Sequence, residues 1–174
     1  MKIAIIGAGN MGQAIAHCLL NKHFITPKKL ILTNPSLGKL NKFEKQGSVC
    51  TIDNKKAVSQ ADIIIFAVKP QKMKFVLEEV REVLENQLIL SIVAGVSIKT
   101  IQQTLGKKNA IARIMPNLAA RVGESMSVWV KSNNVSKTQK KIIEMILEAI
   151  GIQLEVKNEE QINIATAISG SGPA

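Results

Sequence analysis

Short apolar runs alternate along the chain with longer segments in which apolar residues recur at helical spacing. Continuous aliphatic runs are typical of strands buried on both faces of a parallel sheet, whereas the second pattern is typical of helices with one buried face. The predicted strands are Lys2–Ile6, Leu30–Thr33, Val49–Ile52, Ile63–Val68, Leu88–Ala94, Ile111–Met115, Met126–Val130 and Ile152–Val156.

Helices are predicted between most of these strands. The first follows the first strand and reaches about Lys22, and the second covers Ser36–Gln46. Asn54 is the expected cap of a brief third helix. A fourth helix carries the most regular apolar stripe, formed by Met73, Val76, Leu77, Val80, Val83 and Leu84.

Two further helices begin at polar cap signals. Ser136 and Gln139 have the spacing of a capping box, and Gly151 is expected to end the helix that follows. Asn158 and Gln161 repeat the pattern before a last helix. Strands that alternate with helices in this way predict an α/β fold, a Rossmann-like, doubly wound, mostly parallel sheet.

A glycine-rich segment lies between the first strand and the first helix. It reads Gly7-Ala8-Gly9-Asn10-Met11-Gly12, the pattern G-x-G-x-x-G. In this context the first glycine permits a tight turn, the second lets a pyrophosphate approach the backbone, and the third allows the helix to pack closely on the sheet. Free N–H groups at the helix start favour phosphate. We therefore expect a dinucleotide to bind here, with a purely structural glycine turn as the alternative.

The end of the second strand indicates which dinucleotide is preferred. NAD enzymes usually place Asp or Glu there, which accepts hydrogen bonds from the ribose 2′-hydroxyl. This chain has Thr33-Asn34-Pro35-Ser36 instead, with Lys39 nearby. Because no carboxylate there repels a 2′-phosphate, NADP(H) is the preferred cofactor and NAD(H) a possible one. A turn without a ligand is the alternative.

Three later strand ends carry small residues, glycine or proline at the edge where such sheets bind ligands. These segments are Ala67-Val68-Lys69-Pro70, Ala94-Gly95 and Met115-Pro116-Asn117. They leave room for a flat ring, so we expect the first two to line the cofactor groove. An ordinary strand end is the alternative for Ala67–Pro70.

Composition argues against several other functions. The 174 residues include 23 Lys and Arg against 13 Asp and Glu, but the basic residues are scattered and aromatic residues make up only 3%. We therefore expect no nucleic-acid partner. The uncharged stretch Ile3–Leu20 is interrupted by glycines and polar residues, so neither a membrane span nor a signal peptide is expected, and the protein is expected to be cytoplasmic.

Candidate titratable residues point to no catalytic group. Cys18 and Cys50 do not form a disulfide framework or a zinc pattern, and Cys18 is expected in the core. His17 and His23 are expected at the surface, and Arg113 is expected to be either structural or at the surface. Paired carboxylates, a nucleophile with its base, and a metal cluster are not recognisable, so the catalytic residues are unknown and no metal is expected.

Together these motifs resemble pyrroline-5-carboxylate reductases. The resemblance rests on Met1–Met11, Ala67–Pro70, Ala94-Gly95-Val96, Met115-Pro116-Asn117 and, most specifically, Ser-Gly-Ser-Gly-Pro-Ala at 169–174. It extends over all 174 residues. It implies NAD(P)H-dependent reduction of the cyclic imine 1-pyrroline-5-carboxylate to L-proline. In that reaction the main task of the protein would be to orient the nicotinamide and pyrroline rings, and not to supply a strong acid.

The resemblance also implies roles for individual residues. Gly7–Gly12 would hold the pyrophosphate, Asn34 and Ser36 the 2′-phosphate side, and Asn54 the adenosine. The rest of the groove would be lined by Ala67, Val68, Lys69, Pro70, Ala94 and Gly95. The candidates for the substrate pocket are Met115, Asn117, Ser169 and Gly170.

The resemblance further divides the chain into an NAD(P)-binding domain, 1–168, and the start of a helical domain, 169–174. In the family that helical domain forms the homo-oligomer and contributes groups that bind the substrate, so the natural protein is expected to continue. Two alternatives stay open. One is another NADPH-dependent reductase, of the beta-hydroxyacid dehydrogenase type, and the other is a non-catalytic NADPH-binding fragment.

Overall fold

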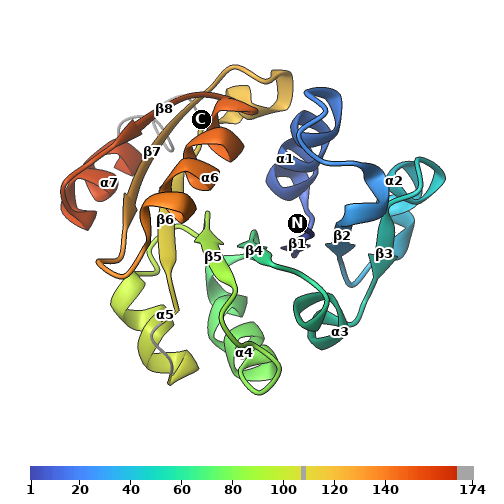
Figure 1. Ribbon diagram of the computed structural model, residues 1–174, viewed down its shortest axis with the longest axis horizontal. Helices are drawn as coiled ribbons and strands as arrows, with labels where there is room; N and C mark the ends of the chain where they lie inside the picture. The colour runs from blue at the N-terminus through green and yellow to red at the C-terminus, as the bar shows by residue number, and fades with distance from the viewer. Residues whose placement is uncertain (107–108, 168–174) are drawn as a thin grey trace.

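The computed structural model of the chain describes residues 1–106 and 109–167, which fold around one eight-stranded sheet (Figure 1). Its strands are β1 (Ile3–Ile6), β2 (Leu30–Thr33), β3 (Val49–Thr51), β4 (Ile63–Phe66), β5 (Leu88–Ser91), β6 (Ile111–Met115), β7 (Ser125–Lys131) and β8 (Gly151–Glu155). Its α-helices are α1 (Asn10–Asn21), α2 (Asn41–Lys45), α3 (Asn54–Ser59), α4 (Pro70–Val80), α5 (Ile98–Leu105), α6 (Lys137–Glu148) and α7 (Glu159–Ala165). Short 3-10 turns are η1 (Pro27–Lys29), η2 (Leu37–Leu40) and η3 (Leu118–Val122).

The strand order is β3-β2-β1-β4-β5-β6-β7-β8. Every pair of neighbouring strands is parallel except β6 and β7. The chain moves outward in one direction from β1 to β3 and in the other from β4 to β8, so the order reverses between β1 and β4. A crevice forms at such a reversal, beyond the carboxyl ends of the strands. The predicted fold class is therefore confirmed.

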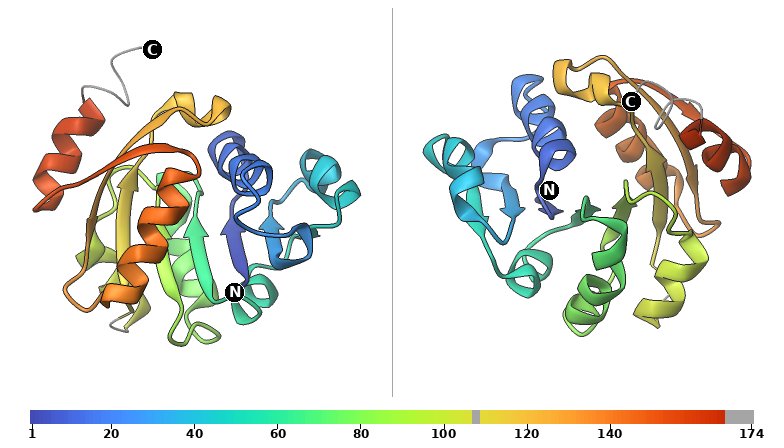
Figure 2. Two further views of the ribbon diagram at one scale, coloured as in Figure 1. Left: turned by 45° about the horizontal axis from the view of Figure 1, so that its top comes forward. Right: turned by 180° about the vertical axis from the view of Figure 1, so that it is seen from behind.

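Alternate residues of the central strands face two separate cores. In β1, Ile3 and Ile5 belong to the core covered by α1 and α6, while Ala4 and Ile6 belong to the core beneath α3, α4 and α5 (Figure 2). All four residues are fully buried. Burial on both faces explains why these strands are continuous apolar runs.

One helix was not predicted from the sequence. α5 lies between β5 and β6, begins at Ser97, whose hydroxyl accepts from Thr100 N at 3.0 Å, and ends at Gly106 with a φ of 64°. Both cap signals are present in the sequence. A helix of eight residues offers only two turns of apolar spacing, so its periodicity is short and easily overlooked.

The predicted boundaries around α2 and α3 need correction. The segment 36–46 is not one helix but η2 followed by α2, since Ser36 N donates to Asn34 Oδ1 and Gly38 weakens the first turn. Asn54 does not cap α3: Asp53 accepts from Lys56 N at 2.9 Å, and Asn54 is the first helical residue. Asn54 is thereby free to face the edge of the sheet.

Further boundaries also differ from the prediction. β4 ends at Phe66 and β5 at Ser91, because the residues after them leave the sheet to form its ligand-facing edge, and α4 ends at Val80. Gly151 does not end a helix; α6 stops at Glu148, and Gly151 begins β8 with a φ of 146°.

Candidate functional site

The glycine-rich loop makes the tight turn expected between β1 and α1. Gly7 has a φ of 82°, and a β-carbon there would collide with Val68, whose Cα would lie at only 3.0 Å. The Gly7 and Ala8 amides both donate to the carbonyl oxygen of Thr33, at 3.1 and 2.7 Å. A β-carbon on Gly12 would lie 3.2 Å from Ile5 Cγ2, so this glycine sets the close packing of α1 on the sheet.

The start of α1 suits an anion. Gly9 is its N-cap residue, and within the described part of the chain no side chain caps the helix and its first turn holds no acidic residue. A β-carbon on Gly9 would approach no atom more closely than Gly7 O, at 3.9 Å, so open space lies over this backbone. Uncapped N–H groups and the positive end of the helix dipole attract a phosphate into such a space.

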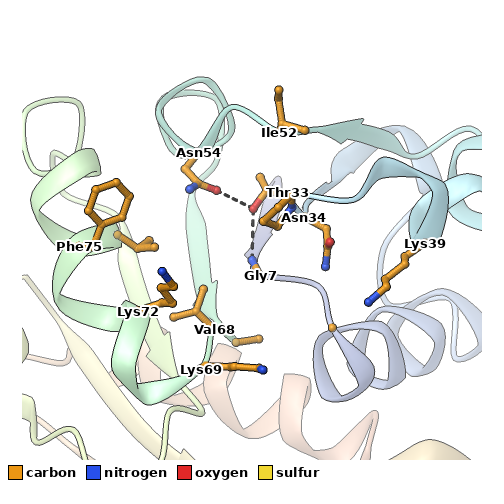
Figure 3. Close-up of a pocket in the computed structure, with 14 residues that line it drawn as sticks. Gly7, Thr33, Asn34, Lys39, Ile52, Asn54, Val68, Lys69, Lys72 and Phe75 are labelled. Atoms are coloured by element: carbon orange, nitrogen blue, oxygen red, sulfur yellow. Dashed lines mark hydrogen bonds between the residues drawn. The ribbon is translucent and has the colours of Figure 1, made fainter.

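A cavity of about 440 Å³ lies beside the loop, between the ends of β2 and β3 and the helix α4 (Figure 3). Gly7 and Gly9 form its floor with Ala67 and Val68. Its walls are formed by Thr33, Asn34, Pro35, Lys39, Ile52, Asn54, Lys69, Lys72, Phe75 and Val76. Ile52 and Phe75 are 64% and 66% exposed, so two apolar side chains of the cavity wall are accessible to solvent.

The charge of this cavity is positive. Lys39, Lys69 and Lys72 line it, and no residue among its described lining is acidic. Lys39 comes from the 3-10 turn η2, whereas Lys69 and Lys72 come from the start of α4. The cavity therefore offers cations from two sides to a ligand with more than one phosphate.

A chain of hydrogen bonds runs through the cavity wall. Gly7 N donates to Thr33 Oγ1 at 3.2 Å, and Thr33 Oγ1 donates to Asn54 Oδ1 at 2.7 Å (Figure 3). Asn54 Nδ2 in turn donates to Glu79 Oε2 at 2.9 Å. Separately, Asn34 Nδ2 donates to Ala8 O at 3.0 Å, which ties the loop after β2 to the glycine turn.

A second hollow of about 230 Å³ lies beside the first at the edge of the sheet. Ala67 and Val68 line both, so the two hollows adjoin, and together they are called the groove below. The remaining walls of the second hollow are Met11, Pro70, Ile92, Val93, Ala94, Met115 and Pro116. No titratable side chain is among them, so this end can orient and dehydrate a flat ring but cannot itself transfer a proton.

The structure brings most of the predicted site residues to this groove. Gly7, Gly9, Asn34, Asn54, Ala67, Val68 and Lys69 line the first cavity, and Met11, Pro70, Ala94 and Met115 line the second. Ser169 and Gly170, with the rest of 169–174, lie outside the described residues.

Six predicted residues line neither cavity. Ala8 and Gly12 are buried, and Ser36 and Gly95 are exposed. Asn10 faces a small separate hollow. Asn117 is used internally, since its Oδ1 accepts from Met126 N at 3.3 Å and its own N–H donates to Ser125 Oγ.

Sequence reasoning missed Ile52, Lys72 and Phe75 as lining residues. Phe75 carried a usable signal, because it is an aromatic residue that falls outside the apolar stripe of its own helix. Lys72 and Ile52 carried none, since their place in the wall depends on how α4 and the end of β3 pack against β1.

Cys18 and His17 line neither hollow of the groove. Cys18 is buried as expected, its Sγ donates to Ala120 O at 3.2 Å, and burial raises the pKa of its thiol. His17 is only partly at the surface: it is half-buried against the Phe43 ring, and burial followed by the charge of Lys42 lowers its pKa. Over residues 1–106 and 109–167, no cluster of His, Cys, Asp or Glu could hold a metal ion. None of the described helices is long and apolar enough to span a membrane.

Comparisons with known proteins agree with this geometry. Residues 2–95 match the model of the family described as NADP oxidoreductase coenzyme F420-dependent. Two curated relatives are pyrroline-5-carboxylate reductases, from Staphylococcus epidermidis (37% identical over the whole chain) and Aquifex aeolicus (33%). The chain spans 65% and 64% of their respective lengths.

Two solved structures are similarly close. A pyrroline-5-carboxylate reductase from Coxiella burnetii superimposes with a TM-score of 0.93 at 37% identity, over 99% of this chain and 64% of that one. Pyrroline carboxylate reductase from Plasmodium falciparum, with NADP bound, gives a TM-score of 0.90 at 35% identity, over 99% and 63%.

Proposed function

Because the chain belongs to the family described as NADP oxidoreductase coenzyme F420-dependent, we propose that its groove binds NADP(H) in preference to NAD(H). We propose further that the complete protein reduces 1-pyrroline-5-carboxylate to L-proline. The observation that carries the proposal is the pair of adjoining hollows, of which one is basic and lies beside an uncapped helix start and the other is apolar. The relatives named above support the choice of substrate.

The pyrophosphate lies at the start of α1 in this proposal. Gly9 leaves the backbone accessible, and the first-turn N–H groups donate to phosphate oxygens. Gly7 and Gly12 act indirectly, since one makes the turn and the other seats the helix. Asn10 and Met11 contribute backbone N–H groups from the same turn.

The adenosine end lies in the basic cavity. Lys39 and Lys72 attract the 2′-phosphate from opposite walls, with Asn34 and Ser36 on the loop between β2 and η2. The adenine ring lies between Ile52 and Phe75, whose exposure in the free protein would fall on binding. The absence of acidic side chains among the described lining favours NADP(H) over NAD(H).

The nicotinamide end lies in the apolar hollow. When bound, the cofactor supplies a hydride to the carbon of the imine. Ile92, Val93 and Met115 exclude water from this end and hold the two rings in contact. We name no catalytic side chain, because a protonated imine accepts a hydride without a strong acid and no titratable group lines this hollow.

The organisation of the complete protein is part of the proposal. We propose that residues 1–168 form the NAD(P)-binding domain and that 169–174 begin a helical domain, which completes the substrate site around Met115 and forms a homo-oligomer. The greater length of the relatives supports a substrate site with contributions from outside these residues. We also propose a cytoplasmic location and no nucleic-acid partner.

Calorimetric titration with NADPH and NADH tests the cofactor, and the fall in reduced-nicotinamide absorbance on adding 1-pyrroline-5-carboxylate tests the reaction. We expect tighter binding of NADPH. Gly9→Ala is the matched variant: its new methyl group meets no protein atom within 3.9 Å, so the fold is kept while the phosphate is obstructed. Failure of the unmodified chain to bind either cofactor would contradict the proposal.

A second candidate function, a non-catalytic NADPH-binding module, is favoured by one observation, the apolar hollow without a titratable side chain. It predicts NADPH binding without oxidation on addition of the imine. The same absorbance measurement on the complete protein separates the two functions.

A further inference from the structure

The carboxylate of Glu79 lies behind the wall of the basic cavity and reaches the glycine turn only through other side chains. We propose that Glu79 is a positioning residue for the cofactor: it holds Asn54 in one orientation and, through Asn54 and Thr33, holds the Gly7 amide. This inference rests on the proposed binding of a dinucleotide. Glu79 itself does not line the cavity, so no direct contact with the ligand is involved.

Glu79 is well placed for this role on its helix. Lys72, Phe75, Val76 and Glu79 follow one another at helical spacing, and the first three line the cavity. Glu79 comes one turn further along the same face, where it meets Asn54 from α3. Its Oε2 lies 2.9 Å from Asn54 Nδ2, and both residues are partly buried.

The direction of each hydrogen bond follows from Glu79. An ionised carboxylate only accepts, so the Asn54 amide must turn its Nδ2 toward Glu79 and its Oδ1 toward Thr33. Thr33 is buried, with an exposed fraction of 1%. Its Oγ1 then donates its single proton to Asn54 Oδ1 at 2.7 Å. Its lone pair is left to accept, at 3.2 Å, the Gly7 N–H, which it shares with the Thr33 carbonyl oxygen at 3.1 Å. Every donor in the series thus meets an acceptor.

Without the Glu79 carboxylate, nothing would fix the directions of these hydrogen bonds. The Asn54 amide could then rotate and present Nδ2 to Thr33, which would turn the threonine proton toward the Gly7 N–H. Two donors would face each other at the turn that shapes the pyrophosphate site. We therefore expect weaker cofactor binding without loss of the fold, because the hydrogen bond between Asn54 and Glu79 is only partly buried.

Glu79→Ala and Glu79→Gln form the test pair, since glutamine can still accept from Asn54 Nδ2 and alanine cannot. We expect about tenfold weaker binding of both NADPH and NADH by Glu79→Ala in calorimetry, near the loss of one charge-assisted hydrogen bond. Glu79→Gln should bind nearly as the unmodified protein does. In the absence of cofactor, amide hydrogen exchange at Gly7 should be faster in Glu79→Ala than in Glu79→Gln or the unmodified protein.

A double-mutant cycle separates positioning from a general structural role. In the Asn54→Ala background, Glu79→Ala should cause no further loss of affinity, because the hydrogen bond through which Glu79 affects the cofactor site is already absent. An additional tenfold loss in that background would overturn the proposal. So would a Glu79→Gln protein that gains affinity for NADPH alone, since this would show that the carboxylate acts by repelling the 2′-phosphate.

The outcomes distinguish this inference from the function on which it rests. If the unmodified protein binds NADPH and Glu79→Ala binds it equally well, the positioning role is wrong and the proposed function stands. If the unmodified protein binds neither cofactor, both are wrong. Thermal unfolding of each variant shows whether a loss of affinity reflects a loss of fold.

Discussion

The guanidinium group of Arg113 lies 2.9 Å from the carboxylate of Glu159, and this ion pair joins β6 to the start of α7. The Arg113 side chain is only 5% exposed, and its second terminal nitrogen donates to Asn163 Oδ1 at 2.8 Å. The same Glu159 oxygen also accepts from Ile98 N, at the start of α5. Of the two roles expected for Arg113, structural or surface, the contacts support the structural one.

Arg113→Ala should lower the free energy of unfolding by about 3 kcal/mol, because it leaves a partly buried carboxylate without its partner. Denaturant unfolding measures this change. Arg113→Met is the matched variant, since it keeps much of the buried volume and shows how much of the loss is packing. Equal stability of the alanine variant and the unmodified protein would contradict a structural role for the ion pair.

Gly151→Ala should destabilise the protein by about 3 kcal/mol or more. The residue has a φ of 146°, and a β-carbon there would collide with the carbonyl oxygen of Ser125 on the neighbouring strand β7. Gly38→Ala is the control, because a β-carbon there would meet nothing within 4 Å, and its effect should stay within about 0.5 kcal/mol. Thermal unfolding of the two variants should differ accordingly.

Lys72→Gln should reduce the preference for NADPH over NADH about fivefold, because one cation that faces the 2′-phosphate is removed. The effect should shrink as salt is added, since the cation is exposed to solvent. Lys74→Gln removes an equal charge from the same helix but outside the cavity, and it should leave the preference unchanged. Equal losses in the two variants would refute a specific role for Lys72.

Phe75→Ala should weaken binding of NADPH and NADH by the same factor, about tenfold, because the adenine is common to both and loses one stacking surface. Its effect on stability should be small, as the side chain is 66% exposed in the free protein. Affinities from calorimetry and unfolding temperatures test the two halves of the prediction. A loss of affinity for NADPH alone would place Phe75 beside the 2′-phosphate and not beside the adenine ring.

The stability of the protein should fall as the pH drops below 6.5. Burial, and then the charge of Lys42, lowers the pKa of His17, so the folded state resists its protonation while the unfolded state does not. The stabilising contribution is thus present above the ordinary histidine pKa of 6.5 and is lost as the pH falls through the lowered value in the folded protein. Unfolding temperatures across pH 7 to 5 (roughly the range in which histidine titrates) measure this slope.

His17→Gln should flatten that slope. His23→Gln is the comparison, since His23 is exposed and lies just beyond the same helix. An unchanged slope in His17→Gln would assign the pH dependence to other groups.

Much of the fold and part of the site could be predicted from local patterns. Runs such as Ile63–Phe66 are buried on both faces, so strand and burial coincide in the sequence. The glycine turn likewise needs only neighbouring residues, because the conformation of Gly7 and the start of α1 are local properties. Boundaries were less certain where side chains cap or strands leave the sheet, as at Asp53 and Gly151.

The α/β class, the glycine turn and the absence of an acidic residue at the end of β2 can be predicted from adjacent positions alone. The packing of distant elements, by contrast, brings Glu79 to Asn54 and places Phe75 and Lys72 in one cavity with the residues after β2. Glu79 and Asn54 are 25 positions apart, and no periodicity links them. Their contact depends on how α3 and α4 pack side by side over the sheet, where the buried faces of the helices, and not the polar residues themselves, set the distance.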